Sequence, residues 1–435
     1  MSYNPQARTV IRGATILTMD PAVGDLDEGD LLVEGSLIGA VGPRLDVADV
    51  DKEIDGTGCV VVPGFVDTHR HMWEALLRGC APHLTIDDYF GQFLCGTARN
   101  VSPGDVRLGT LLSARAALGA GVTTVQDISN IQDSPEHTDA AVEALRESGL
   151  RAVFGYGKSF VRMLSEGSRL PDDVRRVRSQ LLPDDEDLVT LSLVTESGDD
   201  DAELHNHGLA RELGVRTARH VSAEYPVTRL AKLDALLPGT TFIHGSGMDE
   251  QELRVIADSG GGLSIAPAIE LMMGHGYPHF APAAEAGLRI SLSVDVEITA
   301  ACDMFTQMRA AYQAARYGES SSGSTPSVTV QQILHYATLA GAQTLGLGDR
   351  IGSLTPGKQA DLVVLRADRP DVAPVLDPYS TVVLQMDRSH IDTVLVAGQP
   401  VKRRGVDLSD STELLLEARS AAGRLLGLSS RGQGH

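Results

Sequence analysis

Two histidines stand one residue apart at the end of an apolar run, in the stretch VVPGFVDTHRH at positions 61–71. On an extended strand, residues i and i+2 point to the same side, so His69 and His71 can direct both imidazoles at one point while Arg70 faces away. Neutral imidazole is the commonest side-chain metal ligand. The pair can therefore supply half of a site for a metal ion such as zinc, although a lone His-x-His pair also occurs by chance on protein surfaces.

The elements around this pair predict how it is positioned. From Pro63 onward, apolar runs of strand length alternate with amphipathic segments of helical pattern. The predicted strands are 64–68, 122–128, 152–156, 188–195, 215–220, 241–244, 262–266 and 289–294, and the clearest helices are 103–118, 138–148, 203–213 and 250–259. Eight strands with crossover helices predict an α/β fold, a (β/α)8 TIM barrel.

Active sites of such barrels lie at the carboxyl ends of the strands, so polar residues at those ends are the candidates for chemistry. The sequence places a set of such residues there, namely His69, His71, Asp127, Lys158, Glu196, His220, Glu224, His244 and Asp295. A catalytic zinc needs three or four protein ligands and one open position. His69, His71, His220 and Asp295 would supply three imidazoles and a carboxylate from three separate strands.

Two longer motifs resemble those of the amidohydrolase superfamily. Residues 63–71 match the Pro-Gly-hydrophobic-hydrophobic-Asp-x-His-x-His pattern of its first barrel strand. Residues 350–365 resemble its C-terminal Gly-Ser-Leu-x-x-Gly-Lys-x-Ala-Asp-Leu-Val-Val signature, and residues 391–398 resemble the strand that usually follows. The resemblance covers nearly the whole chain and points to the branch of cytosine deaminase and triazine hydrolase, with similarity to S-adenosylhomocysteine and guanine deaminases.

The resemblance also implies a domain organisation. Residues 9–62 read as short strands with turns of Gly and Asp, and β-like sequence returns after Leu345. In the family these two parts form one β-sandwich beside the barrel. We therefore expect residues 1–62 and 346–435 to form a discontinuous β-sandwich domain with a C-terminal helix, and residues 63–345 to form the metal-dependent barrel.

For the metal, the resemblance implies one divalent ion held by His69, His71, His220 and Asp295. Binuclear relatives carry a lysine on the fourth strand, and residues 188–195 contain none; Lys158, after the third strand, is the weaker alternative bridge. Zinc is the expected ion, and ferrous iron suits the same ligands.

The resemblance assigns catalytic roles to three residues. Asp295 would take a proton from the attacking water, His244 would bind the water or the developing oxyanion, and Glu224 would protonate the leaving nitrogen. Relatives of the deaminase type usually have the glutamate three residues after the histidine, whereas Glu224 follows His220 by four. A one-residue change redirects a side chain unless a bulge or turn absorbs it.

Residues that bind the substrate are less evident from the sequence. Trp73, the only tryptophan, follows the histidine pair and could stack on a planar substrate or equally pack beneath its loop. Three further residues, His83, Glu270 and Glu297, follow strand ends and are candidates for the pocket lining. Each of them is equally compatible with an ordinary loop position.

Composition limits the partners. The chain of 435 residues has 37 basic and 58 acidic residues, a formal net charge of −21, which disfavours nucleic acids and anionic membrane surfaces as partners. The four cysteines form no Cys-x-x-Cys pair, and no apolar run reaches the roughly 18 residues that a membrane span needs. We expect a soluble, cytoplasmic protein with a small-molecule or modified-peptide substrate, and the sequence is compatible with a homo-oligomer.

Three functions follow from these observations. The first is hydrolysis of a carbon–nitrogen bond in a small or ring-containing substrate, by attack of metal-activated hydroxide on an sp2 carbon. The second keeps the metal but hydrolyses an amide or amidine in a peptide natural product, as amidohydrolases of ribosomal-peptide pathways such as that of bottromycin do. The third is a non-catalytic metal-binding relative, which the complete set of candidate ligands disfavours.

Overall fold

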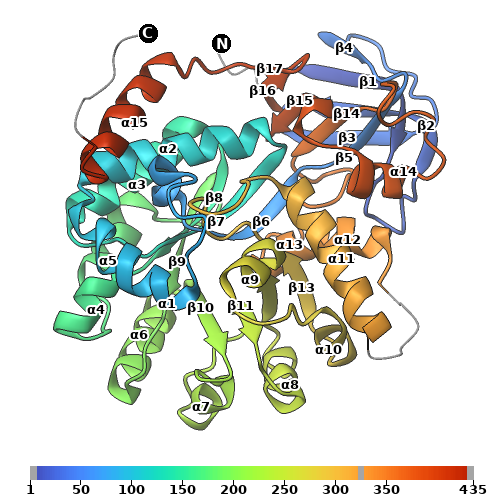
Figure 1. Ribbon diagram of the computed structural model, residues 1–435. Helices are drawn as coiled ribbons and strands as arrows, with labels where there is room; N and C mark the ends of the chain where they lie inside the picture. Colours follow the sequence, from blue (N-terminus) through green and yellow to red (C-terminus); the bar gives the residue numbers. More distant parts are fainter. Residues whose placement is uncertain (1–6, 322–327, 429–435) are drawn as a thin grey trace.

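The computed structural model describes residues 7–321 and 328–428, and a sheet of eight parallel strands forms its centre (Figure 1). The strands follow one another in the sheet in their sequence order, and each overlaps a predicted strand, so the barrel prediction is confirmed. The strands are β6 (Phe65–Arg70), β7 (Val122–Ser129), β8 (Arg151–Tyr156), β9 (Val189–Val194), β10 (Arg216–Ser222), β11 (Thr241–Ser246), β12 (Gly262–Ile265) and β13 (Arg289–Leu292).

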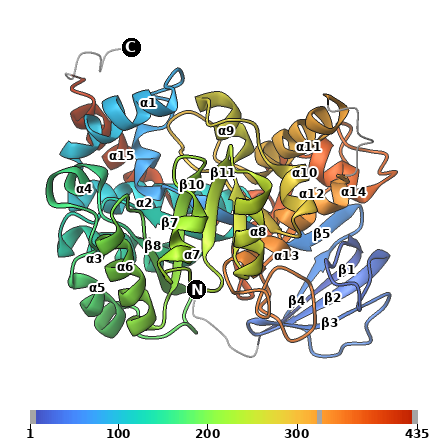
Figure 2. The same cartoon turned by 90° about the horizontal axis from the view of Figure 1, so that it is seen from below.

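Helices connect the strands and cover the outside of the barrel (Figure 2). The first long helix shows why they begin where they do: Ser102 caps it, Pro103 opens it, and Asp105 completes a capping box. The barrel helices are α1 (Ile86–Asp88), α2 (Pro103–Gly119), α3 (Pro135–Ser148), α4 (Phe160–Glu166), α5 (Asp173–Arg176), α6 (Asp200–Leu213), α7 (Val227–Lys232), α8 (Glu250–Asp258), α9 (Pro267–Met273), α10 (Phe280–Glu285), α11 (Met304–Ser321), α12 (Val330–Tyr336) and α13 (Leu339–Thr344), with short η1 (Met72–Leu77), η2 (Tyr89–Leu94), η3 (Thr97–Asn100) and η4 (Val177–Leu181).

The barrel closes between its first and last strands, β6 and β13, through the backbone of Asp295. The Asp295 amide donates to the carbonyl of His69 at 2.9 Å, and the His71 amide donates to the carbonyl of Asp295 at 3.2 Å. Asp67 reinforces this seam, because its carboxylate accepts from the amide of Val294 at 3.0 Å and from Arg70 Nε at 2.7 Å. The seam therefore fixes Asp295 beside the histidine pair.

A second sheet joins the two ends of the chain. β14 (Leu362–Arg366) pairs antiparallel with β5 (Cys59–Pro63), so that Val363 lies opposite Val62. The other strands are β1 (Arg8–Ile16), β2 (Leu26–Glu34), β3 (Leu37–Gly42), β4 (Lys52–Asp55), β15 (Ile391–Val396), β16 (Gln399–Arg403) and β17 (Val406–Asp407), and α14 (Pro378–Ser380), η5 (Thr381–Gln385) and η6 (Arg388–His390) follow β14. The nine strands form one continuous sheet with a core of its own, in which Ile11, Leu31, Val61 and Leu362 are buried.

The chain passes from this sheet into the barrel at Gly64, which separates β5 from β6. That residues 1–62 and 346–435 fold together as one domain, and residues 63–345 as another, stays a prediction. The predicted C-terminal helix is α15 (Thr412–Leu425), and it packs on α2 of the barrel rather than on the terminal sheet (Figure 1). Within the described residues, no helix is long and apolar enough to cross a membrane.

Candidate active site

Three imidazoles and one carboxylate converge at the carboxyl ends of the barrel strands. The Nε2 atom of His69 lies 3.1 Å from Nε2 of His71, 3.2 Å from Nε2 of His220 and 3.5 Å from Oδ1 of Asp295. The same Oδ1 atom lies 3.6 Å from Nε2 of His71. We call these four residues the His/Asp cluster.

The spacing of the ligand atoms around Nε2 of His69 is of the size expected for a metal site. Ligand atoms at about 2.0–2.1 Å from zinc stand about 3.3–3.4 Å apart along the edges of a tetrahedron. The four separations given above, 3.1–3.6 Å, lie around that value, whereas His220 and Asp295 have no contact within 4.0 Å of each other. Four lone-pair atoms gathered so closely repel one another unless a cation lies among them, so the donor set fits a divalent metal.

Neighbouring groups hold the outer nitrogens of two cluster histidines. Nδ1 of His71 lies 2.9 Å from the carbonyl oxygen of Ile128 and 3.1 Å from Oδ1 of Asn130. Nδ1 of His220 contacts a carboxylate oxygen of Glu196, which follows β9. An acceptor on Nδ1 keeps the proton there and leaves Nε2 free for a metal.

Burial keeps most of these imidazoles neutral, which is the state that binds metals. Burial and the adjacent imidazoles hold the pKa of His69 well below its usual value, and burial together with His220 lowers the pKa of His71 to about 3. For His220, burial lowers the pKa, but the adjacent Glu196 carboxylate outweighs it and raises it. Burial raises the pKa of Asp295 to about 8, because without a cation a charge there is poorly solvated.

Two strand-end residues adopt backbone conformations that side chains rarely take. His244 has φ 68° and Asp295 has φ 67°, both in the left-handed region. At His244 the pairing of β10 with β11 slips, since Val221 faces His244 and Ser222 faces Ser246. Strained positions of this kind persist where the surrounding structure fixes them and cluster at functional sites. The Nε2 atom of His244 lies 3.6 Å from Oδ2 of Asp295.

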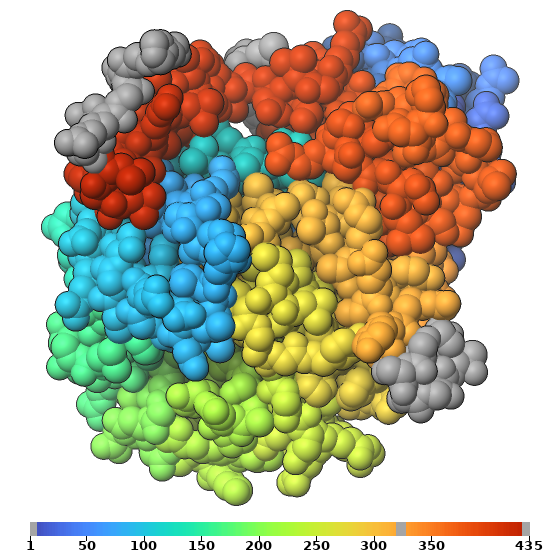
Figure 3. All heavy atoms as spheres, viewed as in Figure 1, coloured from blue at the N-terminus to red at the C-terminus, as the bar shows by residue number. Residues whose placement is uncertain are grey.

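His244 is itself held by a buried carboxyl group. Its Nδ1 lies 3.0 Å from Oε1 of Glu270 on α9, and the same oxygen accepts from the amide of Ala266 at 2.9 Å. The ring of His275, after α9, lies 4.5 Å from the His244 ring, centroid to centroid. In the space-filling view, the segments after β6 and after β12 meet on one face of the barrel (Figure 3).

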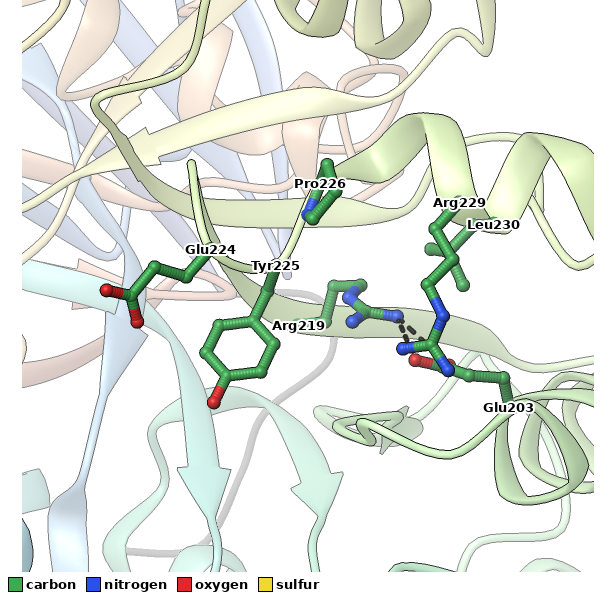
Figure 4. A pocket seen from close by; sticks show the side chains of 7 residues that line it. All are labelled: Glu203, Arg219, Glu224, Tyr225, Pro226, Arg229 and Leu230. Atoms are coloured by element: carbon green, nitrogen blue, oxygen red, sulfur yellow. Dashed lines mark hydrogen bonds and ion pairs between the residues drawn. The ribbon is translucent and has the colours of Figure 1, made fainter.

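Glu224 lies at the tip of a tight turn after β10. The amide of Tyr225 donates to the carbonyl of Ser222 at 3.0 Å, so the extra residue in the His220–Glu224 interval is absorbed by this turn. The Glu224 side chain is exposed and has no side-chain hydrogen bond or ion pair among the described residues. Figure 4 shows its carboxylate directed away from the Arg219–Glu203 pair, across a small cavity of about 40 Å³. The structure does not bring Glu224 into the His/Asp cluster.

The four predicted substrate-binding residues lie in different surroundings. Trp73 is buried, and its Nε1 donates to Asn130 Oδ1 at 3.1 Å, so it packs beneath its loop and supports His71. Glu297 is buried in ion pairs with Arg70 and Arg78. The Nε1 atom of Trp73 and the carboxylate of Glu297 are therefore already bound to other protein groups and are not free to bind a substrate.

Of the remaining two, Glu270 is buried against His244, whereas His83 is exposed. Lys158, the alternative bridge to a second metal, is also occupied: its Nζ donates to the carbonyl of Gly167 at 2.7 Å and pairs with Glu166 at 3.3 Å. A polar side chain that follows a strand end can thus be bound to other protein groups, so its place in the sequence alone does not identify it as part of a pocket.

Three polar residues near the His/Asp cluster received no role from the sequence. Glu196 was visible as the polar residue that ends its strand, but its contact with His220 depends on the register of two strands. Asn130 follows β7 and contacts both His71 and Trp73. Glu74 is fully buried, with Oε1 accepting from Tyr89 Oη at 2.6 Å and Oε2 without a partner among the described residues.

An eight-stranded barrel with a His/Asp cluster at the carboxyl ends of its strands is typical of metal-dependent barrel hydrolases. The chain belongs to the amidohydrolase family, whose model matches residues 60–401. It is a metal-dependent hydrolase of carbon–nitrogen bonds, and the resemblance to the deaminases of the family is confirmed.

The chain is similar in sequence to known deaminases and in fold to several solved structures. The chain is 28% identical to a 5-methylthioadenosine/S-adenosylhomocysteine deaminase of Pelotomaculum thermopropionicum, over 97% of this chain and 99% of that one. An adenosine deaminase of Xanthomonas campestris with bound zinc shares the fold with a TM-score of 0.86 at 22% identity, covering 98% and 100% of the two chains. An atrazine chlorohydrolase of Arthrobacter aurescens, complexed with zinc and atraton, gives 0.84 at 22% identity, covering 95% and 100%.

Proposed function

We propose that this protein is a zinc-dependent deaminase that hydrolyses the amino group of a nitrogen heterocycle, with an aminopurine nucleoside as the substrate class. The observation that carries the proposal is the convergence of His69 with His71 and His220, and with His244 and Asp295, at the carboxyl ends of the barrel strands. The similarity to a deaminase of methylthioadenosine and S-adenosylhomocysteine over nearly the full chain supports the substrate class. It favours a ring substrate over the peptide-tailoring alternative.

In this proposal, the His/Asp cluster holds one zinc ion. Zinc in a site of this kind lowers the pKa of water and polarises the atom that is attacked. A single ion is expected because Lys158, the alternative bridge to a second metal, is already bound to the carbonyl of Gly167 and to Glu166. Elemental analysis after dialysis should give about one equivalent of zinc per chain, and two equivalents would contradict the mononuclear site.

The residues of the chain would then handle the protons. Asp295 accepts a proton from the attacking water, because its Oδ2 faces His244 while its Oδ1 faces the imidazoles. His244, fixed through Nδ1 by Glu270, turns Nε2 toward Asp295 and would accept a hydrogen bond from the attacking water. Glu224 is the proposed donor of a proton to the leaving nitrogen. Its carboxylate is free of protein partners among the described residues, and such contacts often tighten only once substrate is bound.

The surroundings of the enzyme are part of the proposal. The partner is a small molecule, and the strongly acidic composition disfavours nucleic acid. Cys59, Cys80, Cys95 and Cys302 are free thiols, which supports a reducing compartment, the cytoplasm.

The test is ammonia release from a defined panel. The zinc-loaded protein is incubated with 5′-methylthioadenosine, S-adenosylhomocysteine and cytosine, and ammonia is measured by a coupled assay. We expect release from at least one of the two nucleosides, and none from the His71→Ala variant assayed in parallel. Absence of ammonia from all three compounds, with zinc at about one equivalent, would overturn the proposed substrate class.

A further inference from the structure

The residue between the two histidines of the first barrel strand, Arg70, has no role in the chemistry described so far. Strand alternation turns its side chain to the opposite face from His69 and His71. The side chain is nevertheless fully buried. A buried charge is costly unless it is paired and hydrogen-bonded, so the contacts of this guanidinium group need an explanation.

The three nitrogens of the Arg70 guanidinium bind three separate points. Nε donates to Oδ2 of Asp67 at 2.7 Å, Nη1 donates to Oε1 of Glu297 at 3.2 Å, and Nη2 donates to the carbonyl of Cys302 at 3.1 Å. Asp67 belongs to β6, whereas the other two acceptors belong to residues 293–303, between β13 and α11. The planar guanidinium presents its donors in fixed directions. Arg70 therefore ties the segment after β13 to the first strand.

Asp295 lies between two of these attachment points. On one side, Oδ1 of Asp67 accepts from the amide of Val294 at 3.0 Å. On the other side, Glu297 is held by Arg70, and Arg70 itself forms a backbone bridge with Asp295. The backbone of Asp295 has φ 67°, and such a conformation persists only where its surroundings fix it. The contacts of Arg70 supply that constraint.

We propose that Arg70 is a positioning residue of the metal site, which fixes Asp295 for metal binding without contacting the metal itself. This assignment rests on the proposed zinc site. It predicts that the shape of the guanidinium matters as well as its charge. Lysine carries the same charge as a single point on a flexible stem, so Arg70→Lys cannot hold three acceptors in fixed directions.

The experiment compares zinc affinity in the wild type and in Arg70→Lys. Affinity is measured by competition with a chromophoric chelator, and thermal stability is recorded on the same samples. Residues that orient a ligand from outside typically change metal affinity by about 10- to 100-fold, and we expect a loss of that size. The cobalt-substituted proteins supply a second measurement. Their visible spectra report on ligand geometry, so the spectrum of Arg70→Lys should differ from that of the wild type.

A second buried ion pair provides the matched control. Arg151 donates through Nε and Nη2 to the carboxylate of Asp361 at 2.8 and 3.2 Å, and both side chains are almost fully buried. This pair joins β8 to the residue before β14. Arg151→Lys should therefore lower thermal stability but leave zinc affinity and the cobalt spectrum unchanged. An equal loss of zinc affinity in the two lysine variants would show a general effect of stability and overturn the positioning role.

A second variant tests the same contact from its other side. Glu297→Gln keeps the shape of the side chain but removes the charge that binds Arg70, and Asp361→Asn is its control at the second ion pair. If Arg70→Lys does not fold, this comparison replaces it. We expect zinc affinity to fall by about 10-fold in Glu297→Gln and to stay unchanged in Asp361→Asn.

The possible results separate this assignment from the proposed function. Wild-type zinc affinity and a wild-type cobalt spectrum in Arg70→Lys, or in Glu297→Gln if that variant replaces it, would overturn the positioning role and leave the zinc site in place. A wild type that binds no zinc would overturn both. A wild type that binds zinc through a site sensitive to Arg70, but releases no ammonia from the substrate panel, would overturn the proposed reaction and keep the positioning role.

Discussion

The two sides of the His/Asp cluster are built differently. On the seam between β6 and β13, His69, His71 and Asp295 are almost fully buried and joined by two backbone hydrogen bonds. On the opposite side, the His220 side chain is 30% exposed and its partner Glu196 is 25% exposed. There the chain runs on into the turn that carries Glu224, whose side chain is exposed.

The two sides therefore differ in what positions their residues: hydrogen bonds of the barrel backbone on the β6–β13 side, and contacts of residues after strand ends on the β10 side. The seam residues take their positions from strand alternation and from hydrogen bonds of the barrel itself, which hold geometry closely. His220 also lies on a strand, β10, opposite Ile243 of β11, whereas Glu196 and Glu224 follow strand ends and take their positions from side-chain contacts and a turn, which can adjust when substrate binds. We infer that the seam side fixes the metal, while the β10 side adapts to the substrate.

The largest expected effect comes from removing the C-terminal strands that pair with β5, the strand that leads into β6. β5 continues into β6 through Gly64, and β5 pairs with β14 from the C-terminal part of the chain. A chain that ends at Leu345 lacks β14 to β17 and leaves β5 with an unpaired edge, which invites aggregation. We expect no soluble protein, as measured by size-exclusion chromatography. A soluble, zinc-loaded barrel would show that residues 1–62 and 346–435 are not one folding unit.

The strand side is also the side that the sequence predicts well. Apolar runs of strand length locate all eight barrel strands, and the i, i+2 alternation predicts that His69 and His71 lie together, although β6 ends at Arg70 and His71 is the N-cap of η1. The position of Asp295 depends on the end of β13, which the same pattern locates. The strand predictions are confirmed because strand geometry depends on a local repeat of two residues, while the roles of His69, His71 and Asp295 as metal ligands stay a prediction.

Residues after the strand ends are harder to predict, because their partners are distant in sequence. Glu297 pairs with Arg70 across 227 positions, and Trp73 bonds Asn130 across 57. Nothing near these residues in the chain indicates either contact. The turn at Ser222 absorbs the extra residue before Glu224 in a way that the spacing alone does not determine.

The next largest effect should come from the seam histidine itself. His71→Ala removes one of the proposed ligands, and ligand loss removes metal-binding free energy directly. Zinc content should fall from about one equivalent to nearly none, and ammonia release should fall below detection. His83→Ala is the control, because His83 is exposed and outside the cluster, and it should retain both. Full zinc content in His71→Ala would contradict the ligand assignment.

A smaller effect is expected on the β10 side, at Glu224. Glu224→Gln keeps the shape of the side chain but cannot transfer a proton, so turnover should fall by roughly 10²–10⁴-fold if it is the acid. Zinc content and thermal stability should match the wild type, since the side chain is exposed and unpaired among the described residues. The control is Glu250→Gln, an exposed glutamate on α8, which should not change turnover. Wild-type turnover in Glu224→Gln would assign the proton donor elsewhere, with His244 the first alternative.

The smallest expected effect tests whether the β10 side contributes to metal binding through Glu196. This carboxylate contacts Nδ1 of His220, and although burial raises its pKa, the neighbouring His220 lowers it further, to about 2. It is therefore ionised at neutral pH and strengthens His220 as a ligand. Glu196→Gln keeps an acceptor for the imidazole N–H but removes the charge. Loss of such an outer partner typically weakens metal affinity by about 10- to 100-fold.

A loss of about 10- to 100-fold in metal affinity would be partial, and this distinguishes the Glu196 variant on the β10 side from the loss of a direct ligand. Glu196→Gln should lose zinc during dialysis against a weak chelator and regain most activity when zinc is added back, whereas His71→Ala should not recover under the same conditions. The contrast follows from the structure, because Glu196 acts on the metal only through His220, while His71 is a proposed direct ligand. If Glu196→Gln binds zinc as tightly as the wild type, then His220 is held by the barrel alone. The two sides of the cluster would in that case be equally rigid, and the adaptable part of the site would begin only at the turn that carries Glu224.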